Sequence, residues 1–171
     1  MNTLKNRGYR LLQAISIGLL ITTLVGCGGE EPDKGPEYAN ITAYNHTSDY
    51  IHEFYINGSW GGNSRAYGGG GKFVCCIGYP REWHPDLTAT VRWSTSASKP
   101  NPYEGETWHE QVVPIERYTE LGSTLNVHFL AQTKVRLIIS DMGSGHPAYP
   151  GPRPPEKPNG WPFMISKEDP K

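Results

Sequence analysis

Short stretches of alternating apolar and polar residues recur along the middle of the 171-residue chain. The clearest is "LTATVRWS" (87–94), in which Leu87, Ala89, Val91 and Trp93 occupy every second position. Successive side chains of a β-strand point to opposite faces, so this pattern indicates a strand with one face in a core and the other in solvent. The segment therefore predicts one half-buried strand of a β-sheet.

Six more segments have the length and composition of strands. One of them, "KFVCCIGY" (72–79), is almost continuously apolar, as expected for a strand covered on both faces. Another, "TWHEQVVPI" (107–115), has a weaker pattern and is ended by Pro114, which lacks a backbone donor. A tight hairpin at Gln132-Thr133 is expected to join the last two segments. The remaining four strand-like segments are 40–45, 51–57, 124–131 and 134–140.

No segment has a sustained period of 3.6 residues, and only residues 115–121 favour a short helical turn. Seven short strands separated by turns predict a mainly β fold, an antiparallel β-sandwich over residues 39–142. The immunoglobulin-like sandwich is one form that fits this number of strands. Residues 143–171 are rich in proline and glycine, and we expect an extended C-terminal segment that can lie over the sheet.

The N-terminus has the pattern of a bacterial signal peptide. Lys5, Arg7 and Arg10 precede an apolar run over residues 11–25, which is shorter than the roughly 20 residues of a membrane span. The sequence "LVGC" (24–27) then resembles the lipobox of bacterial lipoprotein precursors, in which cleavage precedes the cysteine. An ordinary secretory leader with a coincidental cysteine is the alternative.

The lipobox implies a membrane-anchored lipoprotein of the cell envelope. Residues 1–26 are then the signal peptide, Cys27 carries acyl chains such as palmitate, and residues 27–38 form a flexible tether. By resemblance to enterobacterial sorting rules, Gly28 in place of aspartate favours the outer membrane, with the domain in the periplasm. Exposure at the cell surface is the alternative location.

The composition narrows the kind of partner. Without residues 1–26 the chain holds 13 basic and 17 acidic residues, a net charge of about −4. Nucleic-acid binding requires clustered positive charge, so we expect no nucleic-acid partner. The ten tyrosines, five tryptophans and four phenylalanines supply material for a core and for an interface.

Cys75 and Cys76 are adjacent, and the oxidising periplasm allows disulfides. One interpretation is that the two cysteines are small buried residues of a strand, and another is that they form a vicinal disulfide. A metal pair has little support, because no CxxC or nearby histidine spacing accompanies the two cysteines.

Two loops carry the residues that we predict to contact a partner. In "NGSWGGNSRAYGGGGKFVCC" (57–76), Trp60, Arg65 and Tyr67 belong to types enriched at binding hot spots, although the stretch also fits a plain glycine-rich loop. Its glycine run does not continue into the "GK[ST]" of a phosphate loop. The second loop holds Trp83 and His84, which we predict to contact a partner as well. The alternative for Trp83 is a partly buried side chain that closes the end of the sandwich.

Candidate chemistry is sparse, so we expect no enzyme activity, catalytic residue, metal or cofactor. The serines lack the GxSxG elbow, and the histidines lack zinc-site spacing. Two groups have suitable residue types without suitable geometry, namely Asp141 with Ser144 and His146, and the carboxylates Glu104, Glu106 and Glu110. His128 faces solvent if Val127 and Phe129 face the core, and it is a hydrogen-bonded core histidine in the opposite register.

Several segments together resemble a family of proteobacterial lipoproteins, the domain of unknown function 3304. The paired cysteines after a glycine run, followed by a tryptophan before a strand that ends in tryptophan, are the distinctive features. The matching segments are "YINGSWGGN" (55–63), "GGGGKFVCCIGYP" (68–80), "WHPDLTATVRW" (83–93), "LNVHFL" (125–130), "VRLIIS" (135–140) and "GHPAYPGP" (145–152).

The resemblance implies a context and no reaction. Members look like companions of type VI secretion phospholipase effectors, and they are similar to immunity lipoproteins that protect the producing cell. The implied partner is a co-encoded lipase toxin, inhibited by stoichiometric occlusion. A general envelope module that binds glycan, peptide or protein is the first alternative, and a hydrolase is the second.

Overall fold

The computed structural model describes residues 35–97 and 105–161 of the chain. The signal peptide, Cys27 and most of the tether expected from the sequence lie outside these residues. Nine strands are present in them, and the described residues include no helix, so none there spans a membrane. The strands are β1 (Glu37–Asn45), β2 (Asp49–Ile56), β3 (Ser59–Ser64), β4 (Gly68–Gly69), β5 (Val74–Tyr79), β6 (Thr88–Ala97), β7 (Thr107–Pro114), β8 (Thr124–Phe129) and β9 (Val135–Ile139).

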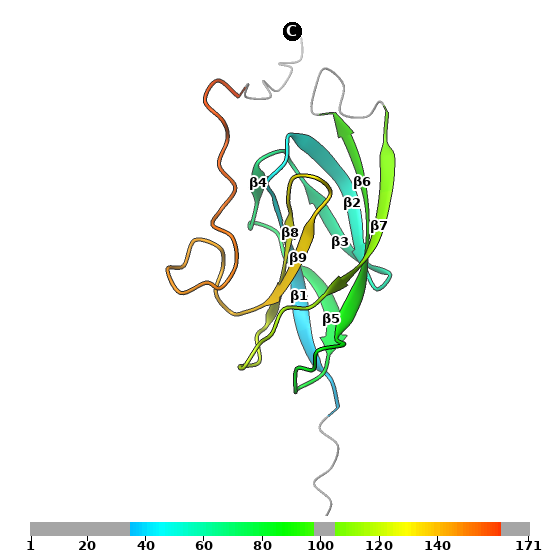
Figure 1. Cartoon of the computed structure of the whole chain (residues 1–171), viewed down its shortest axis with the longest axis vertical. Coiled ribbons are helices and arrows are strands. Elements are labelled where there is room, and N and C mark those ends of the chain that lie inside the picture. Colours follow the sequence, from blue (N-terminus) through cyan, green and yellow to red (C-terminus); the bar gives the residue numbers. More distant parts are fainter. Residues whose placement is uncertain (1–34, 98–104, 162–171) are drawn as a thin grey trace, which may run out of the picture. The chain divides into compact units, whose positions relative to one another are not determined.

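The strands form the two sheets of a β-sandwich, which confirms the predicted fold class (Figure 1). Sheet A has the order β4-β1-β8-β9, with β5 also paired to β1, and sheet B has the order β3-β2-β6-β7. All strand pairs are antiparallel except β1 with β8, which run parallel from Asn40 opposite Thr124 to Asn45 opposite Phe129. The first strand of the domain is thus central in sheet A.

The alternation read from residues 87–94 describes β6 correctly. Ala89, Val91 and Trp93 are buried between the sheets, and Leu87 packs against the same core. Each large apolar side chain removed from water in this way contributes about 1.5–3 kcal/mol to folding. The hairpin between β8 and β9 also agrees with expectation, since Gln132 and Thr133 both adopt the positive φ of a type I′ turn.

Two strands come from the glycine-rich stretch that the hydrophobic pattern left without structure. Asn57 and Gly58, both with positive φ, form the two-residue turn that pairs β2 with β3. A Cβ on Gly61 would lie 2.1 Å from the Phe54 ring, so glycine lets β3 pass close to the core. The helical turn predicted for residues 115–121 is absent, because Ile115 instead bridges to Leu137 of β9.

Residues 143–161 of the C-terminal segment lie over the outer face of sheet A, where β8 lies (Figure 1). Ser144 and Tyr149 of this segment are buried, at 2% and 6% exposure. His128 points away from the Val127 and Phe129 side of the strand, yet it is fully buried. The expectation that such a register exposes His128 is therefore wrong, because the segment supplies a second cover for the strand.

Candidate functional site

Sheet B presents a row of large side chains to solvent on its outer face. The cross-strand register places Tyr55 of β2 between Trp60 of β3 and Arg92 of β6. Trp108 and Val112 of β7 share this outer face. Trp60, Trp108 and Val112 are 51%, 41% and 70% exposed. We call these five residues the aromatic face.

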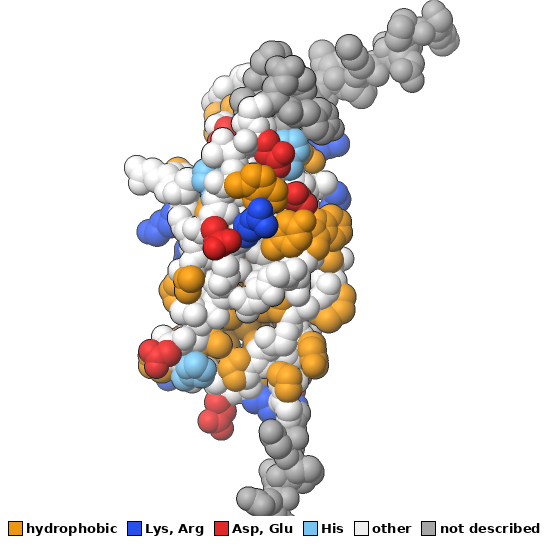
Figure 2. Space-filling view, turned by 90° about the vertical axis from the view of Figure 1, so that its right-hand side faces the viewer, with side chains coloured by type: hydrophobic (Ala, Val, Ile, Leu, Met, Phe, Trp, Pro, Cys, Tyr) orange, Lys and Arg blue, Asp and Glu red, His pale blue; other side chains and the backbone are white. Residues whose placement is uncertain are grey.

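Ring and charge contacts hold the aromatic face together. The Arg92 guanidinium carbon lies 4.2 Å from the Trp108 ring centroid, and the Tyr55 and Trp108 centroids are 6.5 Å apart. The Tyr55 hydroxyl donates a hydrogen bond of 2.6 Å to the Glu53 carboxylate, which raises the pKa of Tyr55. Figure 2 looks onto this side and shows apolar side chains gathered around a basic one, with acidic side chains beside it.

This arrangement suits binding to a macromolecular surface. Tryptophan, tyrosine and arginine are the types that dominate interface hot spots, and strands of a sheet hold them rigidly. A shallow hollow of about 400 Å³ lies among Tyr55, Thr90, Arg92 and Glu110. This hollow has room for a protruding side chain of a partner. The face offers contact area and charge without a deep cavity.

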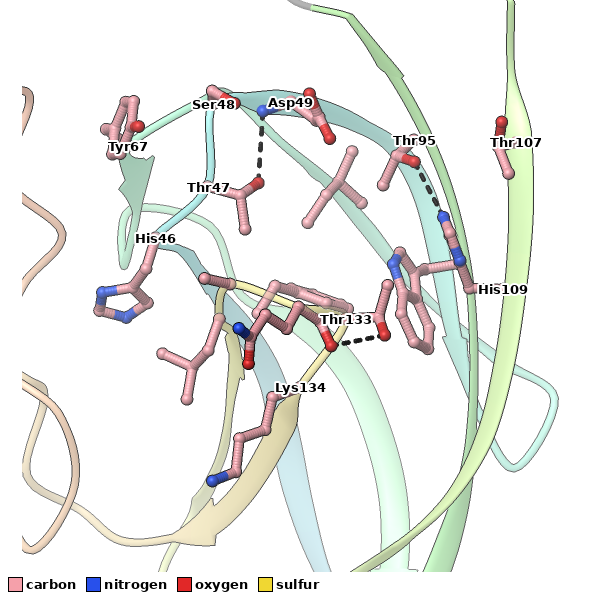
Figure 3. Close-up of a pocket in the computed structure, with 16 residues that line it drawn as sticks. His46, Thr47, Ser48, Asp49, Tyr67, Thr95, Thr107, His109, Thr133 and Lys134 are labelled. Atoms are coloured by element: carbon pink, nitrogen blue, oxygen red, sulfur yellow. Dashed lines mark hydrogen bonds between the residues drawn. The ribbon is translucent and has the colours of Figure 1, made fainter.

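A second hollow lies between the sheets at the end where β1 finishes; we call it the end pocket (Figure 3). Its volume is about 560 Å³. Its apolar lining includes Ile51, Trp93 and Phe129. Polar groups complete the lining, and they come from the β1–β2 connection, β2, β6, β7 and the β8–β9 turn. They include His46, Thr47, Asp49, Thr95, Thr107, His109, Thr133 and Lys134.

His46 connects the end pocket to a buried hydrogen-bond chain. Its Nε2 lies 3.0 Å from Nδ1 of His128, and Nε2 of His128 lies 2.6 Å from the Tyr149 hydroxyl. The Tyr44 ring stacks on His128 at 4.7 Å between centroids. Burial, with smaller contributions from His46 and Arg136, lowers the pKa of His128 to about 3. Burial likewise lowers the pKa of His46 and raises that of Tyr149.

The structure distributes the three contact residues predicted in the glycine-rich stretch over three places. Trp60 belongs to the aromatic face. Arg65 is exposed beside the glycine run and lines a separate hollow of about 370 Å³. Tyr67 lines the end pocket, and its ring meets the Trp161 ring edge-on at 4.8 Å.

Trp83 and His84 lie in the β5–β6 connection, at the end of the sandwich where β1 begins. The Trp83 indole donates a hydrogen bond of 2.9 Å to the Ile115 carbonyl and packs partly against the core. Trp83 therefore closes the end of the sandwich, which was the alternative to its prediction as a contact residue. His84 is exposed.

Cys75 and Cys76 are joined as a vicinal disulfide at the start of β5, with Cys75 exposed. The sequence alone did not decide between this disulfide, two buried thiols and a metal pair. Cys27, the predicted acylation site, lies outside the described residues.

Among the residues that the structure describes, the groups with types suitable for catalysis do not bond to one another. Asp141 accepts hydrogen bonds from Ser123, which lower its pKa, and Ser144 is buried against Tyr44. Glu106 and Glu110 are exposed, and Glu104 lies outside the described residues. Within residues 35–97 and 105–161, no group of three or more His, Cys, Asp or Glu side chains is placed to hold a metal ion.

Sequence reasoning missed most of the aromatic face. Tyr55, Arg92 and Trp108 lie in segments read only as strands, and their outward positions follow from the same alternation that buries their neighbours. A tryptophan or tyrosine at an outward position of a strand is the signal that would have identified them.

Comparison with known proteins finds one family. The sequence profile of a family described as a protein of unknown function (DUF3304) matches residues 44–137, more than half of the chain. No curated protein and no solved structure matches the chain.

Proposed function

The chain belongs to the DUF3304 family, and we propose that it is an immunity lipoprotein that binds and occludes a co-encoded lipase effector of type VI secretion. The acyl chains on Cys27 would hold it in the outer membrane, with the sandwich in the periplasm. The protein would act stoichiometrically and without turnover. Neither a cofactor nor a nucleic acid enters this function.

The aromatic face is the observation that carries the proposal. A tryptophan, a tyrosine and an arginine in mutual contact on rigid strands form a hot-spot cluster, and Trp60 extends it to the sheet edge. Standard protein–protein interfaces bury about 1,600 Å² in total, half of it on each partner. The outer face of a four-stranded sheet offers contact area of this order.

A lipid anchor suits an inhibitor of a membrane-active toxin. A phospholipase must reach the bilayer to act, and an inhibitor confined to the same surface meets it at a raised effective concentration. One acyl chain alone binds reversibly, whereas the two or three chains of a lipoprotein cysteine give a lasting anchor. The choice of a lipase as the partner rests on the resemblance described from the sequence.

Co-purification with the neighbouring lipase tests the proposal. We expect the lipoprotein to capture the co-encoded enzyme and to abolish its phospholipase activity at equimolar ratio. Trp108→Ala and Arg92→Ala should each weaken binding about tenfold or more, as truncation of a hot-spot residue does. Phe73→Ala is the matched control, because Phe73 is 62% exposed and lies outside the aromatic face.

Two results would contradict the proposal. If the lipoprotein does not bind the co-encoded lipase, the lipase is not its partner and the proposal is wrong. Equal weakening by Trp108→Ala and Phe73→Ala removes the aromatic face as the site, and binding must then be sought elsewhere on the sandwich.

A further inference from the structure

The end pocket is lined by hydroxyl groups that come from separate elements. Thr47 lies in the β1–β2 connection, Thr95 and Thr107 face each other across β6 and β7, and Thr133 lies in the β8–β9 turn. Figure 3 shows these four side chains around the pocket. Thr107 is exposed at the rim. The Thr47 hydroxyl donates to Asn45 Oδ1 at 2.8 Å and the Thr133 hydroxyl to the Gln132 carbonyl at 2.6 Å, so toward a ligand these two groups can only accept.

Aromatic rings supply the apolar part of one wall. The Trp93 indole and the His109 imidazole stack at 5.0 Å between centroids, with 22° between their planes. The His109 Nε2 lies 3.0 Å from the Thr95 hydroxyl, so the ring and the hydroxyl fix each other. Phe129 packs against Trp93 from the other sheet, at 5.7 Å between centroids. The wall is therefore held in place before any ligand arrives.

We propose that the end pocket binds a neutral sugar, specifically an N-acetylated amino-sugar unit of an oligosaccharide. Its volume of about 560 Å³ lies within the usual range for small-ligand sites. Hydroxyl and imidazole groups exchange hydrogen bonds with sugar hydroxyls, and the apolar wall accepts the C–H faces of a ring or an acetamido methyl. Asp49 and Lys134 are the charged side chains of the lining, one of each sign, so no net charge selects an anion.

The position of the pocket fits a glycan of the envelope. β1 begins at Glu37, next to the expected tether, and its nine residues span about 30 Å before His46 reaches the pocket. The pocket thus opens at the end of the sandwich opposite the start of β1. The choice of an amino sugar rests on the proposed envelope location, whereas the neutral-sugar chemistry rests on the lining alone.

Ligand-observed NMR on the full lipoprotein in a sugar-free detergent tests the inference. The probes are the N-acetylglucosamine trimer and maltotriose, which distinguish the amino sugars of the cell wall from a free plain oligosaccharide. We expect the N-acetylglucosamine trimer to bind with a Kd of about 1 mM or tighter. Maltotriose should bind at least fivefold more weakly.

Valine substitutions locate the binding. Thr107→Val and Thr95→Val each remove one pocket hydroxyl with little change of shape, and each should weaken trimer binding at least fivefold. Thr107→Val also leaves the hydrogen bond between Thr95 and His109 in place. Thr88→Val, on an exposed position of the same strand as Thr95, is the control and should change nothing.

Each other outcome overturns part or all of the inference. No binding of either sugar, or equal binding by the wild type and both pocket variants, removes the sugar site. Equal affinity for the two sugars removes the amino-sugar choice. Capture of the lipase should survive Thr107→Val, so failure of the sugar site and failure of the proposed immunity function are separable.

Discussion

At the residue scale, His128 shows how this sandwich accommodates a buried polar group. The side chain has no exposed surface, and both ring nitrogens have partners, His46 on one side and Tyr149 on the other. Loss of one partner would leave a buried donor or acceptor without a hydrogen bond, at a cost of about 1–3 kcal/mol. The neutral imidazole is therefore part of the native packing.

The depressed pKa of His128 predicts a loss of stability in acid. In the unfolded chain the His128 imidazole takes up a proton near its ordinary pKa of 6.5, while in the folded protein it stays neutral down to a pH of about 3. The free energy of unfolding should thus be full above pH 6.5 and fall toward pH 3, by up to about 1.4 kcal/mol per pH unit for one proton. Urea denaturation at a series of pH values measures this slope.

A pair of variants separates His128 from the other titrating groups. His128→Gln should reduce the slope between pH 6.5 and pH 3, since residue 128 then takes up no proton in the unfolded chain. His46, whose pKa is also lowered by burial, keeps its own contribution to the slope. His84→Gln, at an exposed histidine, should leave the slope unchanged. Identical slopes for the wild type and His128→Gln would contradict the prediction.

The vicinal disulfide gives a second prediction at this scale. Because Cys75 and Cys76 are bonded to each other, intact mass should rise by about 2 Da on reduction, the mass of the two hydrogen atoms gained. Without reductant, denatured protein should take up no alkylating reagent at these two positions. Labelling of both cysteines before reduction would show that the bond is absent from the isolated protein.

At the element scale, the limits of the sequence patterns follow from what fixes each strand. Strands with one apolar face, such as β6, are readable because core burial imposes the alternation. β3 and β4 have few apolar side chains, so hydrophobic alternation does not reveal them. Their placement depends on glycine and on the Asn57-Gly58 turn, and Asn-Gly is the dipeptide that would have predicted a hairpin there. The cover over β8 depends on Tyr149, far along the chain, which no local pattern reveals.

The close passage of β3 over the core predicts that Gly61→Ala is destabilising. The new methyl group would lie 2.1 Å from the ring of Phe54, which is fully buried and cannot move aside. We expect a loss of about 1–3 kcal/mol, the usual cost of overpacking a core. Gly71→Ala is the control, because a methyl group at that position would meet no atom within 4 Å. Equal denaturation midpoints for the two variants would rule out the tight contact.

At the scale of the whole molecule, the proposed function divides between the expected lipid anchor and the folded domain. From the expected acylated Cys27 to the start of β1 at Glu37 the chain spans ten residues, at most about 35 Å when extended. Acylation at Cys27 would therefore hold the domain near the bilayer. The aromatic face and the end pocket occupy different sides of the sandwich. One partner on the sheet and another ligand at the end can bind without competing.

Cys27→Ser tests the value of the anchor. We expect unprocessed or soluble protein, with weaker protection of cells that produce the toxin. The purified domain should still inhibit the lipase, since the aromatic face is intact. Survival assays beside in vitro phospholipase assays measure both effects, and equal protection by the wild type and Cys27→Ser would show that anchoring is dispensable.

The parallel pairing of β1 with β8 sets the order in which the polypeptide can mature. Residue 40 finds its neighbour only after residue 124 has left the ribosome, so the middle of one sheet cannot close on an incomplete chain. Such long-range closure slows folding to milliseconds or longer. For the export that the expected leader implies, this delay would leave time for residues 1–26 to engage the export machinery before the last strands arrive.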